Sequence, residues 1–249
     1  MRDVMDLHTH TIASGHAYST LYEMAHAASE KKLELFGSTD HGPRAEGAPN
    51  ELFFLNFKVI PSELCGVRLL MGCELNILDY EGNVDLEPRH LMKMDYAIAS
   101  IHKICYTGGT VAQNTSAVVG AMKNPYVKII GHPDDSRFPI DPDTVVAAAK
   151  EHRVLLEVNS ASLNPRSVRQ GARENYEKIL ERCVHYGAPI LIGSDAHIAA
   201  DVANHTDAWA LLNELRFPEE LIINTSVDKL IPYIPSITGN LFHEAGFWR

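Results

Sequence analysis

The sequence lacks several features that would assign it to common protein classes. No stretch approaches the ~18 consecutive apolar residues of a membrane-spanning helix, so a membrane protein is not expected. The first residues, MRDVMDLHTH, contain no apolar segment of the signal-peptide type, which makes a cytoplasmic location the expected one. The four cysteines form no C-x-x-C pair and predict reduced thiols, which excludes a disulfide framework and a thiolate metal site.

Basic residues are also scarce, and histidine is abundant. The chain has 22 Lys and Arg against 32 Asp and Glu, a formal net charge of −10, and no basic tract. Because proteins that bind nucleic acid rely on Lys and Arg contacts with phosphates, a nucleic-acid partner is not expected. The 13 histidines are a high number for 249 residues. Bound divalent cations would offset part of the negative charge.

Short apolar or β-branched runs alternate with helical periodicities along the chain. The strand-like runs cover residues 4–8, 33–41, 68–75, 95–102, 127–132, 153–160 and 189–197. Such alternation is typical of βα units around a parallel sheet. Without a repeat, a low-complexity tract or a Gly/Ser linker, the pattern predicts one α/β domain over residues 1–249, a barrel of seven βα units. Residues 216–249 are expected to form a closing strand, a helix interrupted at Pro232, and a tail.

Local signals predict where individual elements begin or turn. Thr20 with Glu23 forms a capping box, a typical start of a helix. Asp201 is expected to cap the helix that follows it. Residues 81–83, Glu-Gly-Asn, predict the turn of a small hairpin between the third and fourth strands.

Side chains that bind metals concentrate at the C-terminal ends of the predicted strands. In a parallel barrel these ends form one face, so the side chains are expected to converge there. The H-x-H and D-x-H spacings each place both residues on one side of a strand. Nine residues belong to this set: His8, His10, His16, His41, Glu74, His102, His132, Asp195 and His197. Without cations, so many imidazoles and carboxylates would be costly to desolvate, and the sequence therefore predicts a metal site.

Any one of these histidines alone is more often a hydrogen-bonded structural residue than a ligand. The prediction therefore depends on the set. The remaining histidines end no predicted strand and are expected to be solvated or to lie at helix ends; they are His26, His90, His152, His185, His205 and His243.

The order of motifs along the chain resembles the PHP (polymerase and histidinol phosphatase) superfamily, and within it the YcdX-like phosphatase subgroup. The motifs are H-x-H, "TDH", an isolated Glu, "SIH", "GHP" and "SDAH". The resemblance implies a distorted (β/α)7 barrel with three metal ions, usually zinc, and a homotrimer. It also implies three ligand sets: His8, His10, Asp195 and a bridging Glu74; then His16, His41 and His197; then Glu74, His102 and His132.

The residue types predict the chemistry of this centre. Imidazoles and carboxylates suit Zn²⁺, Mn²⁺ or Fe²⁺. Metals held about 3.5–4 Å apart lower the pKa of a shared water, which makes hydroxide available near neutral pH. The expected function is hydrolysis of a small phosphomonoester by a metal-bridging hydroxide, with Asp195, Glu74 and His197 as catalytic residues.

Polar residues near the ligands are candidates for supporting roles. Lys103, Arg137 and Arg166 lie in loops after strands and are candidates to bind the substrate's anionic parts, although each equally fits a solvated loop cation. Asn159 ends the one strand without a predicted ligand and is expected to hydrogen-bond a ligand, water or substrate. Asp6 and Asp40 adjoin ligand histidines but face the other side of a regular strand, where they can only support the ligands.

Two alternatives remain open. A phosphodiesterase or exonuclease of the PHP type would use the same metals, but the acidic chain lacks the basic track that a nucleic-acid backbone requires. A non-catalytic metal-binding protein would not need ligands fixed on six strands.

Overall fold

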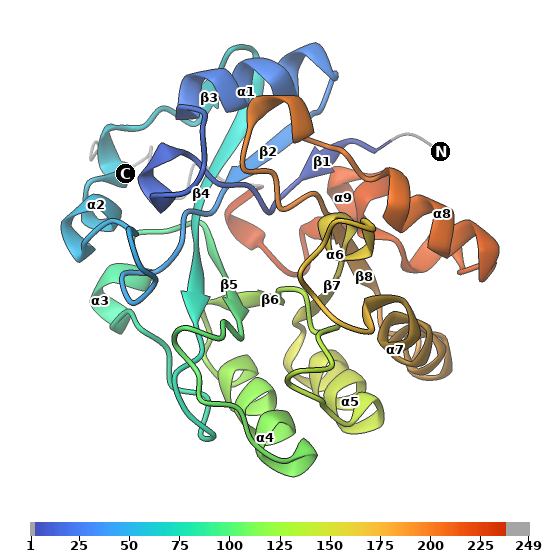
Figure 1. Cartoon of the computed structure of the whole chain (residues 1–249). Helices are drawn as coiled ribbons and strands as arrows, with labels where there is room; N and C mark the ends of the chain where they lie inside the picture. The colour runs from blue at the N-terminus through green and yellow to red at the C-terminus, as the bar shows by residue number, and fades with distance from the viewer. Residues whose placement is uncertain (1–2, 238–249) are drawn as a thin grey trace.

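A parallel β-sheet coiled into a barrel forms the centre of the computed structural model, which describes residues 3–237 (Figure 1). Neighbouring strands run in the order β1-β2-β4-β5-β6-β7-β8, and every pair in this path is parallel. The strands are β1 (Met5–Asp6), β2 (Leu35–Ser38), β4 (Val67–Asn76), β5 (Tyr96–Ser100), β6 (Val127–Ile130), β7 (Leu155–Asn159) and β8 (Ile190–Gly193), with β3 (Glu63–Leu64) antiparallel beside β4. The predicted (β/α)7 barrel is confirmed.

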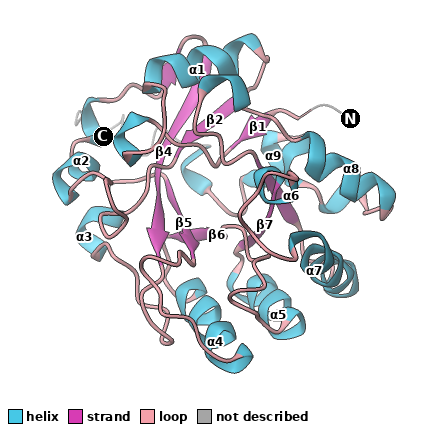
Figure 2. Cartoon of the chain, viewed as in Figure 1, coloured by secondary structure: helices cyan, strands magenta, loops and turns pink. Residues whose placement is uncertain are grey.

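Helices surround the strands, as Figures 1 and 2 show. They are α1 (Leu21–Glu30), α2 (Glu51–Leu55), α3 (Pro88–Leu91), α4 (Val111–Met122), α5 (Pro142–His152), α6 (Ser160–Leu163), α7 (Ala172–Tyr186), α8 (Thr206–Glu214) and α9 (Val227–Leu230). Within residues 3–237, no helix combines the length and the apolar character that crossing a bilayer requires.

The three local predictions have different outcomes. The capping box is confirmed, because Thr20 and Glu23 bond each other's backbone N–H at the start of α1. The hairpin is reduced to a single antiparallel bridge between Ile77 and Val84. The prediction for Asp201 is wrong: Asp201 ends a 3₁₀ turn, and α8 begins five residues later, at Thr206.

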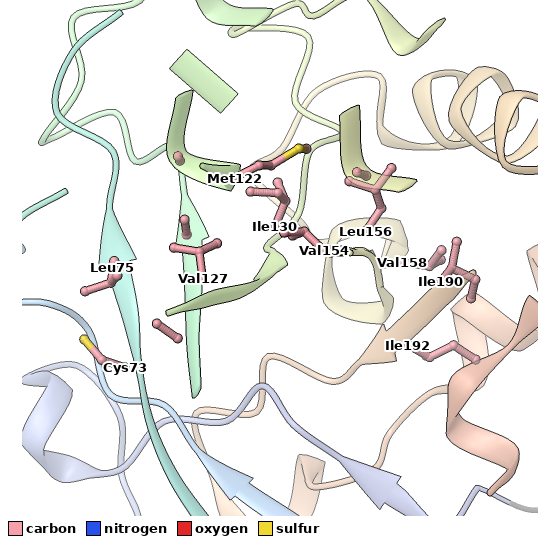
Figure 3. Packing of buried hydrophobic residues seen from close by; sticks show 14 of the residues in the cluster. Cys73, Leu75, Met122, Val127, Ile130, Val154, Leu156, Val158, Ile190 and Ile192 are labelled. Carbon is pink, nitrogen blue, oxygen red and sulfur yellow. The ribbon is translucent and has the colours of Figure 1, made fainter. Parts of the chain in front are cut away.

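Two apolar layers hold the barrel together. The inner layer fills its interior and receives one or two residues from every strand of the path: Met5 and Leu7, Leu35, Leu70, Tyr96 and Ile98, Ile129, Leu155 and Leu191. The outer layer packs the strands against the helices, and Figure 3 shows part of it, including Leu75, Ile130, Leu156 and Ile190. Since side chains alternate along a strand, the same short strands supply both layers.

The seam between β8 and β1 closes the barrel without the predicted closing strand. At its upper end Thr9 bridges to Ala196. At its lower end a 3₁₀ turn (Ile223–Thr225) takes the place of a strand, and Asn224 bonds the backbone of Val4, Met5 and Ile192. The predicted closing strand is reduced to a single parallel bridge between Ile190 and Ile222, and the amide side chain of Asn224 makes the further bonds to the neighbouring strands. The helix that follows, α9, ends two residues before Pro232, and the tail from residue 238 onward lies outside the described residues.

Two histidines outside the predicted metal set lie at helix ends, as one part of the expectation has it, but they are buried and not solvated. His90 is 1% exposed and His205 is 2% exposed. His205 lies between carboxylates from the first strand region, with Nδ1 2.9 Å from Asp3 Oδ2 and Nε2 3.5 Å from Asp6 Oδ1. These two carboxylates offset the cost of burying a positively charged His205 ring. His243 lies outside the described residues.

The stability of the barrel should depend on pH through His205. Burial opposes charge on the ring, but Asp3 and Asp6 outweigh it and raise the pKa of His205 to about 9. A raised pKa stabilises the fold fully below the unfolded value of about 6.5, and this contribution is lost as pH rises through about 9. We expect a loss of roughly 3 kcal/mol of unfolding free energy across this window.

Urea denaturation at several pH values would measure this dependence in the native chain and in His205→Gln. The variant should be less stable at pH 6.5 and should lose less stability on going to pH 9.5. His185→Gln, at an exposed position of α7, is the control and should behave as the native chain does. If the unfolding free energy of the native chain and that of His205→Gln depended on pH equally, the role of His205 in this pH dependence would be contradicted.

Candidate metal centre

Glu74 lies at the centre of the predicted metal site. It occupies the C-terminal part of β4, and its side chain is fully buried. Five imidazoles surround it, with nitrogen–oxygen distances of 2.7 Å for His41 and His132, 3.2 Å for His102, 3.4 Å for His8 and 3.5 Å for His10. The structure thus brings together the ends of β1, β2, β4, β5 and β6.

The loop after β8 completes the cluster. Asp195 places Oδ1 3.2 Å from His10 Nε2 and 3.7 Å from His8 Nε2. His197 faces His16 with their Nε2 atoms 3.0 Å apart. Asp195 and His132 have positive φ angles of 54° and 30°, which residues other than glycine rarely adopt. Such backbone strain is concentrated at functional sites.

Hydrogen bonds fix the orientation of most of the rings through Nδ1. The partners are Glu157 for His8, Ser14 Oγ for His10, the Ser14 carbonyl for His16, Asn76 Oδ1 for His102 and the Asp195 carbonyl for His197, at 2.6–3.1 Å. A carboxylate or carbonyl oxygen only accepts, so the facing Nδ1 carries the proton. Nε2 of a neutral ring then keeps its lone pair, which is the form that binds a metal.

The orientation of Ser14 and Asn76 follows from their other partners. The hydroxyl of Ser14 donates to Asp40 Oδ1 at 2.7 Å, so it accepts from His10. The amide nitrogen of Asn76 donates to the Gly42 carbonyl and to Asp85, so its oxygen faces His102. Asp40 therefore supports a ligand histidine indirectly.

His41 is the exception among the rings around Glu74. Its Nδ1, not its Nε2, faces Glu74. Within residues 3–237, four of the buried atoms that point into the cluster make no hydrogen bond: His8 Nε2, His10 Nε2, His41 Nδ1 and Glu74 Oε2, although the last two lie 2.7 Å apart as an ion pair. Buried polar atoms without partners are costly, and coordination of a cation would satisfy all of them. The donor set therefore fits divalent metal ions.

The ligand atoms form overlapping groups. Within each of four groups the atoms lie within 4.8 Å of one another: His10, His41 and His197; His8, His132 and Asp195; His8, His10 and Glu74; His41, Glu74 and His102. Because His8, His10, His41 and Glu74 each belong to two groups, the geometry suits several neighbouring cations that share ligands.

The charges in the cluster are mutually dependent. Burial opposes ionisation of Glu74, but His102, His8 and His41 outweigh it and hold its pKa well below the usual value. Asp195 is mostly buried, with its side chain 10% exposed; burial opposes its ionisation, but His8 and His10 outweigh it and lower its pKa well below normal. Both carboxylates are therefore ionised at neutral pH and are suited to bind cations.

Two residues at the site were not singled out in the sequence. Glu157, on β7, bonds His8 and is fully buried. Arg169 lies in the loop after β7, 3.4 Å from Asp195 Oδ2, with its side chain 17% exposed. For Glu157 a signal existed, because it shares a strand face with Asn159, two positions later. The loop position of Arg169 gave no such signal.

The predicted substrate-binding residues lie in different surroundings. Asn159 donates to Asp195 Oδ2 at 3.2 Å, so it reaches a predicted ligand. Arg137 is paired with Asp135, with its Nε 2.8 Å from Oδ2. Lys103 is exposed. Arg166 is also exposed and lines a polar cavity of about 240 Å³, which Asp195 borders as well.

Removal of one predicted ligand should remove metal without unfolding the barrel. His10→Ala deletes an unpartnered nitrogen at the cluster, while the inner apolar layer lies on the strands below it. We expect metal affinity to fall by more than the roughly 10–100-fold that loss of a supporting residue costs. Metal content by mass spectrometry and secondary structure by circular dichroism would check this; global unfolding of His10→Ala would contradict it.

Comparisons with known proteins agree with this geometry. A model of the PHP domain matches residues 6–161. A probable phosphatase of Clostridium novyi (strain NT) is 44% identical over 236 residues, which cover 95% of this chain and 96% of the relative. A probable phosphatase of Caldanaerobacter subterraneus subsp. tengcongensis is 46% identical over 235 residues, covering 94% and 92%.

Among solved structures, the histidinol phosphate phosphatase of Lactococcus lactis, complexed with zinc, L-histidinol and phosphate, has a TM-score of 0.58 at 16% identity and covers 87% of this chain and 95% of its own. An archaeal ribonuclease P bound to mature tRNA contains a chain with a TM-score of 0.54 at 18% identity, covering 94% and 89%. At these identities the likeness concerns the fold alone. The family model and the full-length relatives together show that the chain belongs to the PHP family.

Proposed function

We propose that this protein is a metal-dependent phosphatase that hydrolyses small phosphomonoesters. The observation that carries the proposal is the buried Glu74 carboxylate among five imidazoles, with several unpartnered ligand atoms directed at one another. The names of the relatives, probable phosphatases over the full length of the chain, support the reaction class.

Nine side chains would hold the metals, with three zinc ions as the expected complement and Mn²⁺ or Fe²⁺ as alternatives. They are His8, His10, His16, His41, Glu74, His102, His132, Asp195 and His197. When bound, the ions would supply hydroxide near neutral pH and positive charge for the oxygens of a phosphate group. The zinc bound to the Lactococcus lactis structure is consistent with this expectation.

The chain itself supplies groups that bind and orient an anion at the rim. Burial opposes the charge of Arg169, but Asp195 and Asp134 outweigh it and raise its pKa, so the guanidinium stays charged. Arg169 can therefore bind phosphate oxygens beside Asp195. Asn159 donates to Asp195 Oδ2 and holds that carboxylate in place, which leaves Oδ1 directed at His10 and His8.

The substrate-binding role of three further residues stays a prediction; they are Lys103, Arg137 and Arg166. Among these, Arg137 is the least available, because its guanidinium already pairs with Asp135. The homotrimer and the cytoplasmic location also stay predictions.

Hydrolysis assays should separate the proposed function from its alternatives. We expect protein loaded with Zn²⁺ or Mn²⁺ to cleave an aryl phosphomonoester faster than the corresponding aryl diester, and chelation followed by metal return to abolish and restore the activity. Preferred cleavage of the diester would favour the exonuclease alternative. Cleavage of neither substrate by metal-replete protein would favour a metal-binding protein without catalysis.

Arg169 should contribute to phosphate binding more than Arg166 does. Arg169→Ala removes the charged donor beside Asp195, so we expect kcat/KM for the monoester to fall by ~100-fold or more, with metal content retained. Arg166→Ala, three residues earlier and exposed, is the comparison and should lower kcat/KM less than Arg169→Ala does. Equal effects of the two substitutions would contradict the role of Arg169.

A further inference from the structure

Glu157 is a buried carboxylate beneath the proposed metal centre and is not one of the nine predicted ligands. It lies on β7, two residues after Leu155 of the inner apolar layer, and its side chain is fully buried. Its Oε1 lies 2.8 Å from His8 Nδ1. Its Oε2 accepts from the backbone N–H of His132 at 2.8 Å and from Asn159 Nδ2 at 3.2 Å.

These bonds connect Glu157 to three predicted ligands from three different strand ends. It contacts the ring of His8 and the backbone of His132, and it reaches Asp195 through Asn159, whose Nδ2 also donates to Asp195 Oδ2 at 3.2 Å. His132 and Asp195 are the two ligands with positive φ angles. Such backbone conformations are strained and persist only where surrounding contacts hold them.

Gly193 makes room for the Glu157 carboxylate. Gly193 ends β8, which pairs with β7. A Cβ atom at this position would lie 1.8 Å from Glu157 Oε1 and 2.9 Å from its Cδ, and 3.2 Å from His8 Cβ. Any larger residue would push the carboxylate away from His8. The absence of a side chain at Gly193 is therefore part of the same arrangement.

We propose that Glu157 is a positioning residue that sets the metal affinity of the centre through His8. The Glu157 carboxylate accepts two N–H bonds at Oε2 and faces His8 with Oε1, an arrangement of acceptors that keeps the proton of His8 on Nδ1. Nε2 then presents its lone pair toward Glu74 and Asp195, 3.4 and 3.7 Å away. A supporting carboxylate of this kind typically changes metal affinity by 10–100-fold. The inference rests on the proposed metal-dependent function.

Glu157→Gln is the first test, because it keeps the size of the side chain. Its amide oxygen can still accept from the backbone N–H of His132, which directs the amide NH₂ toward His8. An NH₂ donor favours the His8 tautomer with the proton on Nε2, where it blocks coordination. We expect Zn²⁺ affinity, measured by competition with a chromophoric chelator, to fall 10–100-fold. The visible spectrum of the Co²⁺-loaded variant should also change, while its circular dichroism matches the native chain.

Gly193→Ala tests the same contact from the other strand. It should weaken Zn²⁺ affinity in the native background, where it displaces the carboxylate, and have a smaller further effect in Glu157→Ala, where only the 3.2 Å contact with His8 Cβ remains. Residues that act through one contact give such non-additive effects. Asn224→Ala, at a buried site bonded to the β8 and β1 backbones and to none of the predicted ligands, should lower stability and leave Zn²⁺ affinity unchanged.

The outcomes distinguish this inference from the proposed function. If Glu157→Gln binds Zn²⁺ within twofold of the native chain and gives the same Co²⁺ spectrum, the role of Glu157 is overturned while the metal centre stands. If Gly193→Ala weakens affinity equally in both backgrounds, the contact with Glu157 is not what Gly193 protects, and the inference fails. If the native chain binds no divalent metal, the proposed function fails and the inference fails with it.

Discussion

The buried negative charge of Glu74 is the constraint on which the rest of the site depends. A carboxylate with no exposed surface is costly unless cations or polar hydrogens surround it. Here the compensation comes from five imidazoles at four strand ends, which can reach one point only because the sheet curves into a barrel. The charge therefore couples the closure of the fold to the assembly of the site. Divalent ions would complete the balance, since imidazoles alone leave buried ligand atoms without partners within residues 3–237.

Because side chains alternate along a strand, every second residue points into the barrel. These inward residues include both the apolar residues that stabilise the barrel and, nearer the C-terminal end, the polar residues of the site. On β7, Leu155 packs into the inner apolar layer, Glu157 bonds His8, and Asn159 bonds Asp195. Leu70 and Glu74 repeat this order on β4. The apolar layer below can therefore hold the barrel while the polar layer above carries ligands, because each strand changes character only near its C-terminal end.

Sequence alone predicted the strands and the convergence of their polar ends, because alternation and strand direction are local properties. What it missed depends on contacts between distant segments. His205 is buried because Asp3 and Asp6, about two hundred residues earlier, compensate its charge. The closing strand is reduced to one bridge, from Ile222 to Ile190, because the Asn224 side chain makes the other bonds. Arg169, and not Arg166, approaches Asp195, and only the path of an irregular loop decides between them.

The ring orientations at the site are set by protein groups that do not themselves face the metals. Glu157, Asn76 and the Ser14–Asp40 pair each fix Nδ1 of one histidine, and these supports come from different strands and loops. A ring held in one tautomer and one orientation loses little freedom when it binds an ion, so part of the entropic cost of coordination is met on folding. His41 departs from this pattern, because it turns Nδ1 toward Glu74. Its geometry shows that the cluster is organised around the carboxylate, with each imidazole presenting whichever nitrogen reaches it.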